Sequence, residues 1–180
     1  DTGSGKTRIY AEISNHTLAS GKSCIILTPE ISLTAQLLIE LKRDISSPIY
    51  VLHSNLTIAQ KRNIWLSIYR TKEPCVVIGP RSALFSPVLN LGLIVLDEFH
   101  DNSYKQDQLP RYNSIYVAAK LAKIHQCRLI LGSATPPIAD YYLFKEKKLP
   151  IVRITGSATG LQQSTDVSVI NLKDKSSFTR

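Results

Sequence analysis

Five short, almost uninterrupted apolar runs, separated by longer amphipathic stretches, constrain the fold of this chain more than any other feature of its sequence. Runs that do not alternate with polar residues are typical of central parallel strands covered on both faces. Parallel neighbours need a crossover connection, and the intervening stretches have helical length and spacing. We therefore predict an α/β three-layer sandwich with a mainly parallel sheet. The expected strands are 23–28, 49–53, 75–79, 91–98 and 127–134, and the expected helices are 6–20, 31–45, 57–72 and 112–125.

Apolar residues at helical spacing mark the expected helix 57–72, and they are Ile58, Trp65, Leu66 and Tyr69. Such a stripe normally faces the core of the protein. We therefore expect Trp65 to belong to the core rather than to stack on a nucleic-acid base.

The composition narrows the classes of function. The chain has 22 Lys and Arg residues against 14 Asp and Glu, a formal charge of +8, which favours a polyanionic partner, nucleic acid being one of several. No apolar run approaches the roughly 18 residues that cross a bilayer, so we expect no membrane partner. Cys24, Cys75 and Cys127 form no C-x-x-C pair, which predicts buried reduced thiols in a cytoplasmic protein rather than a zinc site.

The residues D-T-G-S-G-K-T at 1–7 match the end of a phosphate-binding loop, G-x-x-x-x-G-K-[ST], whose first glycine would lie one residue before Asp1. Since the chain also lacks methionine, we expect a piece of a longer protein. In such loops backbone N–H groups surround phosphate oxygens, the lysine reaches the outer phosphates and the last hydroxyl binds Mg²⁺. The residues concerned are Gly3, Ser4, Gly5, Lys6 and Thr7. Alone, the pattern also fits a terminal run with no such role.

The run L-G-L-I-V-L-D-E at 91–98 ends in two adjacent carboxylates. In a nucleotide-hydrolysing α/β domain, a buried strand of this kind lies beside the phosphate loop, and Asp97 would hold the hydration shell of Mg²⁺. Glu98 would orient and deprotonate the attacking water. The alternative is a strand that ends in a solvated acidic turn. The occurrence of the Asp–Glu pair together with the loop at 1–7 favours ATP hydrolysis instead.

The sequence G-S-A-T-P at 132–136 follows the last expected strand. Ser133 and Thr135 would lie at the carboxyl end of that strand, where ligands bind in open α/β sheets. In one interpretation, their hydroxyls would couple the phosphate site to a neighbouring lobe through hydrogen bonds to His100 or Asp97. In isolation, however, the pattern favours an ordinary turn.

Taken together, G-S-G-K-T, D-E-x-H and S-A-T, in this order, resemble the motifs of the first RecA-like lobe of superfamily 2 DEAH-type helicases. Longer segments are similar to the PriA family of primosomal replication-restart helicases (primosomal protein N′). These segments are TPEISLTAQ (28–36), VLHSNLT with KRNIW (51–65), GPRSALFSP (79–87), LGLIVLDEFHDNSYKQ (91–106) and PRY (110–112). The resemblance implies a RecA-like P-loop NTPase lobe over residues 1–155, followed by a linker and the start of a second lobe over 156–180.

The resemblance also implies a function: an ATP-dependent DNA helicase with 3′→5′ polarity that acts in primosome assembly and in restart of stalled replication forks. It implies ATP and Mg²⁺ as cofactors, with zinc only in a part of the protein outside this sequence. The implied partners are single-stranded and forked DNA, the primosome and single-strand-binding proteins, in the bacterial cytoplasm at the nucleoid. The alternatives are another superfamily 2 DNA translocase and a non-catalytic DNA-binding remnant.

Residue roles follow from the same resemblance. Lys6, Asp97, Glu98 and His100 would be catalytic, with Ser133 and Thr135 coupling hydrolysis to movement. The loop after the acidic motif mixes aromatic and basic residues, a composition that suits single-stranded DNA, although by itself it slightly favours a surface loop with packed tyrosines. The DNA-contacting residues would be Arg81, Ser82, Tyr104, Lys105, Gln106, Arg111 and Tyr112. Pro80 stands where the family commonly has Thr, so a phosphate contact there would rest on Arg81 and Ser82.

Overall fold

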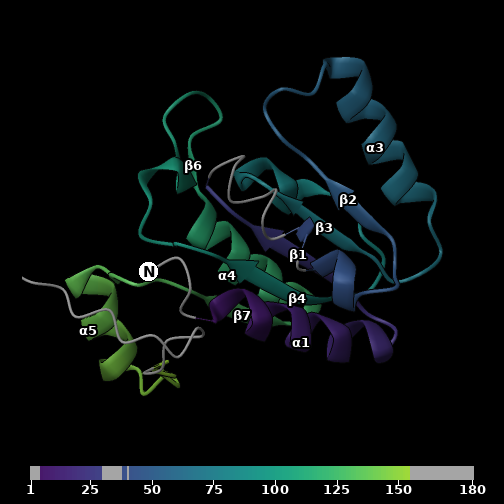
Figure 1. The fold of residues 1–180 in the computed structure, drawn as a ribbon. Helices are drawn as coiled ribbons and strands as arrows, with labels where there is room; N and C mark the ends of the chain where they lie inside the picture. Colours follow the sequence, from purple (N-terminus) through teal and green to yellow (C-terminus); the bar gives the residue numbers. More distant parts are fainter. Residues whose placement is uncertain (1–4, 30–37, 40, 155–180) are drawn as a thin grey trace, which may run out of the picture.

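The computed structural model of the chain describes residues 5–29, 38–39 and 41–154, and its centre is a five-stranded sheet (Figure 1). The strand order is β2-β3-β1-β4-β7, and every neighbouring pair is parallel. The strands are β1 (Ser23–Leu27), β2 (Ile49–Val51), β3 (Val76–Gly79), β4 (Leu91–Leu96) and β7 (Arg128–Leu131). All five expected strands are therefore confirmed, each with shorter ends than the apolar runs suggested.

Three of the helices follow the expected bounds closely, and a fourth, which comes after β7, was not predicted from the sequence. They are α1 (Lys6–Ala19), α3 (Ile58–Arg70), α4 (Ser114–His125) and α5 (Ile138–Glu146), with short 3₁₀ helices η1 (Arg81–Phe85) and η2 (Asn102–Tyr104). A small antiparallel pair, β5 (Lys105–Gln106) and β6 (Tyr112–Asn113), precedes α4. Most of the expected helix 31–45 and the whole segment 156–180 lie outside the described residues.

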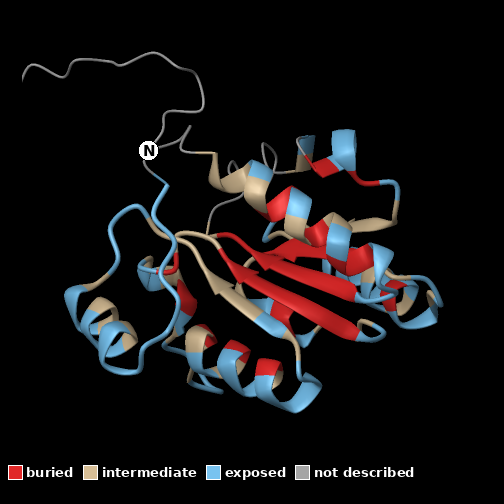
Figure 2. Ribbon diagram, turned by 90° about the horizontal axis from the view of Figure 1, so that it is seen from below, coloured by how far each residue is buried: buried red, intermediate tan, exposed pale blue. Residues whose placement is uncertain are grey.

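Alternate strand residues divide the core between the two faces of the sheet. On one face, Cys24 and Ile26 pack with Tyr10 and Ala11 of α1. On the other, residues such as Ile25 pack in the cluster that holds buried residues of α3 and α4. Figure 2 shows the buried residues concentrated in the strands and on the helix faces turned toward them. Burial on both faces explains why the strand sequences are apolar without alternation.

The expectation for Trp65 is wrong. Its side chain is 44% exposed and its ring stacks on Tyr69, with 5.7 Å between the ring centroids, while Ile58 is 88% exposed. Helix α3 turns a different stripe toward the sheet, in which Ile68 is buried and Ile64 packs against the same core cluster. Because neighbouring residues in a helix point about 100° apart, the packing of Ile64 against the core carries the adjacent Trp65 toward solvent.

Within the part of the chain that the structure describes, no helix combines the length and the apolar character that a membrane span requires.

The three thiols differ in burial, which predicts a reactivity order. Cys24 and Cys75 are fully buried, and Cys127 is partly exposed. Burial raises the pKa of all three thiols, that of Cys24 to about 12. Since only the accessible thiolate reacts, iodoacetamide at about pH 8 should alkylate Cys127 at least about tenfold faster than the other two. Peptide mass spectrometry of a time course measures the alkylation rate of each cysteine. The Cys127→Ser variant is the control and should show only the slow reaction of the other two thiols. Equal rates for all three thiols in the native protein would contradict the described core.

Candidate active site

The candidate site lies where the carboxyl ends of β1, β4 and β7 meet the start of α1. Backbone hydrogen bonds join the segments that follow the strands: Asp97 N–H donates to the Leu27 carbonyl at 2.9 Å, and Gly132 N–H donates to the Leu96 carbonyl at 2.8 Å. The Phe99 N–H in turn donates to the Gly132 carbonyl at 3.0 Å. These bonds fix the acidic residues after β4 relative to both neighbouring strands.

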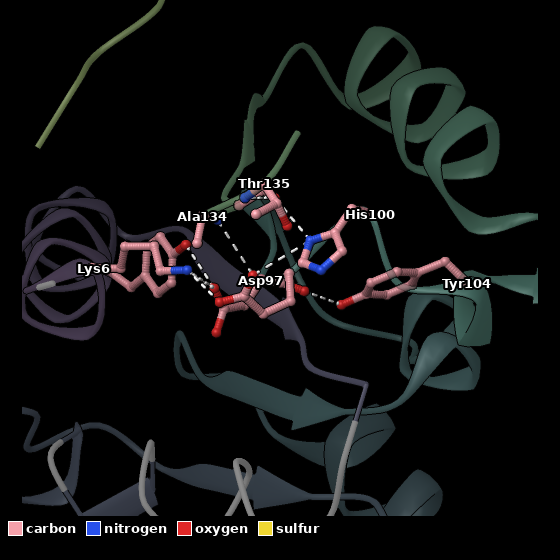
Figure 3. Close-up of polar contacts among 9 residues, drawn as sticks. Lys6, Asp97, His100, Tyr104, Ala134 and Thr135 are labelled. Atoms are coloured by element: carbon pink, nitrogen blue, oxygen red, sulfur yellow. Dashed lines mark hydrogen bonds and ion pairs between the residues drawn. The ribbon is translucent and has the colours of Figure 1, made fainter. Parts of the chain in front are cut away.

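Lys6 lies between the two carboxylates of the acidic motif. Its ammonium group donates a hydrogen bond to Glu98 Oε1, and Nζ is 3.8 Å from Asp97 Oδ1. Lys6 is the first residue of α1, and it reaches toward Asp97 in Figure 3. All three side chains are largely buried, so the ion pairs are only weakly screened by solvent. The structure thus brings together the lysine and the two acids that the sequence predicted to act together.

The electrostatic environment shifts the pKa values of Asp97 and Glu98 in opposite directions. Burial raises the pKa of Asp97 more than the Lys6 ammonium lowers it. Burial would also raise the pKa of Glu98, but the hydrogen bond and charge of Lys6, with smaller contributions from the Ala134 N–H and His100, outweigh it and lower that pKa. Glu98 is therefore ionised at neutral pH and held by a cation.

The backbone turns sharply at Glu98. Its φ is +46°, a left-handed conformation that costs free energy for a residue with a side chain. The turn is closed by the Asp101 N–H, which donates to the Glu98 carbonyl at 2.8 Å. The strained conformation and the bonds that hold it are what direct the Glu98 carboxylate toward Lys6.

Ser133 and His100 form a second contact across the site. Ser133 Oγ is 2.8 Å from His100 Nδ1, and that same nitrogen is 3.5 Å from Glu98 Oε2. Ala134 N–H donates to Glu98 Oε2 at 3.5 Å, and Thr135 contributes through its backbone N–H, which donates to Ser133 Oγ at 3.0 Å (Figure 3). The segment after β7 is thus linked to the acidic motif, and the coupling role of Ser133 and Thr135 stays a prediction.

The described residues fit a bound Mg²⁺–nucleotide. Oxygen ligands such as Asp97, Glu98 and the Thr7 hydroxyl are those that Mg²⁺ prefers. Gly5 caps α1 with a φ of +77° and offers no side chain to its first N–H groups, which leaves them for an anion. The expected phosphate ligands Gly3 and Ser4 lie outside the described residues.

The expected DNA contacts lie around η1 and the segment 101–113. Ser82, Lys105 and Arg111 are exposed, and Gln106 and Tyr112 are half-buried. Arg81 is tied to the neighbouring loop, because its Nη1 donates to the carbonyls of Ser103 at 2.5 Å and of Lys105 at 3.2 Å. Part of the donor capacity of Arg81 is therefore used within the protein.

The expectation that Tyr104 stacks on DNA is wrong for this structure. Tyr104 is 1% exposed, and its hydroxyl donates to the backbone carbonyl of Asp97 at 2.6 Å. The Ser114 hydroxyl donates to the Tyr104 carbonyl at 2.9 Å, and Asp101 accepts from the Ser103 N–H at 2.7 Å, which turns the chain inward. The ring is a buried support beneath the acidic motif, not an exposed stacking surface.

Tyr10 was not singled out from the sequence, although it also contacts the site. Its hydroxyl donates to Asp97 Oδ1 at 3.0 Å, and the residue is 3% exposed. It stands four residues after Lys6, so both side chains lie on one face of α1, and this spacing is the signal that could have identified it.

Comparison with known proteins agrees with this geometry. Residues 1–143 match the family model of the DEAD/DEAH box helicases. The chain belongs to this family. Among solved structures, the C-terminal domain of the DEAD-box protein Dbp5 is similar in fold, with a TM-score of 0.51 and 12% identity over 80% of this chain and 77% of that one. The RecA-like architecture expected from the sequence is thereby confirmed.

Curated relatives of this DEAD/DEAH box helicase chain are replication restart proteins PriA. The protein of Bacillus subtilis (strain 168) is 48% identical over 140 residues, which are 78% of this chain and 17% of that protein. The protein of Treponema pallidum (strain Nichols) is 41% identical over 171 residues, 93% of this chain and 26% of that protein. The resemblance to the replication-restart family is confirmed, and the chain spans no more than about a quarter of the length of these relatives.

Replacing Tyr104 by Phe tests its role as a buried support. The change keeps the ring and removes the donor to the Asp97 carbonyl, so the free energy of unfolding should fall by about 1 kcal/mol. Urea denaturation followed by circular dichroism measures the change. Tyr112→Phe is the matched control, since the Tyr112 hydroxyl makes no hydrogen bond to the described residues and its ring only packs edge-on against Phe85. Equal stability of Tyr104→Phe and the unmodified protein would contradict this role.

Proposed function

We propose that this chain is the ATP-binding lobe of an ATP-dependent DNA helicase that acts in replication restart. The observation that carries the proposal is the cluster of Lys6, Asp97 and Glu98 at the carboxyl edge of the sheet. It is supported by the DEAD/DEAH box helicase family and by relatives whose names specify replication restart. Within the chain, we assign residues 1–155 to the lobe and 156–180 to a linker and the start of a second lobe.

The residues of the site divide the work of hydrolysis. Bound Mg·ATP supplies the phosphoanhydride bond and a divalent charge that offsets the charge of its phosphates. Gly3, Ser4 and Gly5 would hold the phosphates through backbone N–H groups, and Lys6 would leave Glu98 to contact them. The Thr7 hydroxyl and Asp97 would hold Mg²⁺. Glu98 would orient the attacking water and accept its proton.

Coupling and DNA contact are assigned to the residues around this centre. His100, bonded to Ser133, would transmit the state of the Glu98 carboxylate to the segment 132–135 and onward to a second lobe. The exposed residues Ser82, Lys105 and Arg111 would contact DNA phosphates, with Arg81, Gln106 and Tyr112 beside them. Tyr104 would act from beneath, by joining this loop to the backbone of Asp97.

The finer parts of the proposal come from the resemblance alone. They are 3′→5′ polarity, preference for forked and single-stranded DNA, partnership with the primosome and single-strand-binding proteins, and a cytoplasmic location at the nucleoid. Zinc would be bound only by residues outside this sequence.

The proposal predicts a DNA-dependent ATPase in the full-length polypeptide. Steady-state hydrolysis should rise with single-stranded DNA and most with a forked duplex, and Glu98→Gln should lower kcat by about 10²–10⁴-fold. Glu73→Gln, at an exposed residue, is the matched control and should leave kcat unchanged. Equal stimulation by any single strand would leave a translocase without the fork specificity of replication restart. Activity that is insensitive to every DNA would overturn the helicase assignment and favour a binding remnant.

A second prediction concerns chain 1–180 by itself. Motors of this kind complete the active site with an arginine from the second lobe, which stabilises charge in the transition state. The isolated chain should therefore hydrolyse ATP at least about 10³-fold more slowly than the full-length polypeptide, even when circular dichroism shows that it is folded. Turnover at the full-length rate would mean that the described site is complete without a second lobe.

A further inference from the structure

Asp97 Oδ1 is shared by two side chains of α1. Lys6 Nζ lies 3.8 Å from it, and the Tyr10 hydroxyl donates to it at 3.0 Å. The carboxylate of a free aspartate rotates broadly about its last torsion, so an ion pair alone fixes it poorly. A hydrogen bond from the Tyr10 hydroxyl restricts the orientation of the carboxylate, because the Tyr10 ring is itself held in the core cluster that contains Cys24 and Ile26.

Gly132 provides the space that the Tyr10 hydroxyl occupies. A Cβ atom placed on Gly132 would lie 1.8 Å from the Tyr10 hydroxyl oxygen and 3.0 Å from the ring carbon that bears it. The backbone of Gly132 cannot easily move aside, since its N–H donates to Leu96 and its carbonyl accepts from Phe99. A side chain at position 132 would therefore push the hydroxyl away from Asp97.

We propose that Tyr10 is a positioning residue: seated against Gly132, its hydroxyl holds Asp97 Oδ1 and thereby orients the carboxylate for Mg²⁺. A group that donates a hydrogen bond to the oxygen of a carboxylate that does not bind the metal fixes the orientation of that carboxylate in this way. A phenol that donates to Oδ1 leaves the lone pairs of Oδ2 free for the metal or its water shell. The contact joins three segments distant in sequence: α1, the end of β4 and the end of β7.

The inference rests on the proposed function, in which Asp97 holds Mg²⁺, and it goes beyond it by assigning roles to Tyr10 and Gly132. Neither residue touches the reacting atoms, so the effect is expected on metal binding first and on turnover only through it. A purely structural role would instead lower stability without a selective loss of metal affinity.

The test uses the full-length polypeptide with ADP, and Mn²⁺ as a spectroscopic substitute for Mg²⁺. Electron paramagnetic resonance of free Mn²⁺ should show that Tyr10→Phe weakens metal binding to the protein–ADP complex by roughly tenfold. Affinity for a fluorescent ADP analogue in excess EDTA should stay within about twofold, because the change spares Lys6 and the phosphate loop. Tyr116→Phe, at a tyrosine that is exposed on α4, is the matched control and should change neither quantity.

A double-mutant cycle tests the pairing of Tyr10 with Gly132. Gly132→Ala should weaken Mn²⁺ binding about as much as Tyr10→Phe, because it displaces the same hydroxyl. The double variant should bind Mn²⁺ no more weakly than Gly132→Ala alone, since Gly132→Ala has already moved the hydroxyl that Tyr10→Phe removes. Effects that multiply would overturn the pairing. If Gly132→Ala does not fold, Tyr10→Phe alone decides the proposal.

Asp97→Asn separates failure of this inference from failure of the proposed function. If Asp97→Asn loses Mn²⁺ binding and Tyr10→Phe keeps it, the positioning role is overturned and the proposed function stands. If the unmodified protein binds no Mn²⁺ together with ADP, both are overturned.

Discussion

The contact of Lys6 with Asp97 and Glu98 is the interaction on which the rest of the site depends. Two adjacent carboxylates at the end of a buried strand repel each other and lose hydration, and both effects disfavour their charged forms. The ammonium group of Lys6 offsets this for Glu98, whose pKa is lowered, and only partly for Asp97, whose pKa is raised. The lysine at the start of α1 and the acids after β4 therefore form one electrostatic unit, although Lys6 and Glu98 are 92 positions apart in the chain.

The sheet makes that unit possible, because the carboxyl ends of parallel strands meet at one edge. β4 lies between β1 and β7, and backbone bonds continue past its end from Asp97 to Leu27 and from Gly132 to Leu96. Phe99 and Tyr104, which follow the acids, are buried in the core cluster of the α4 face. The acidic motif is thus anchored from both sides, and the left-handed turn at Glu98 is held in place rather than left to relax.

The sequence predicted the strands and the ionic centre because both depend on strong, local signals. Uninterrupted apolar runs predict buried parallel strands, and a glycine–lysine–threonine end with a strand-terminal Asp–Glu predicts a phosphate site. The aromatic residues were harder to place. Trp65 was expected inside and is exposed, whereas Tyr104 was expected on the surface and is buried. The environment of Trp65 depends on the rotation of a helix, and that of Tyr104 on the inward turn of a loop. The role of Tyr10 depends on its contact with Asp97, which is 87 positions away in the chain.

The same lysine that stabilises the acids also holds Glu98 in a weakly basic state. The hydrogen bond from Lys6 is the largest of the influences that lower the Glu98 pKa, ahead of Ala134 and His100. A phosphate ligand that draws the ammonium group toward itself would remove that influence and leave burial opposed by the contributions of the Ala134 N–H and His100. The affinity of Lys6 for phosphate and the environment of Glu98 are therefore linked through one hydrogen bond.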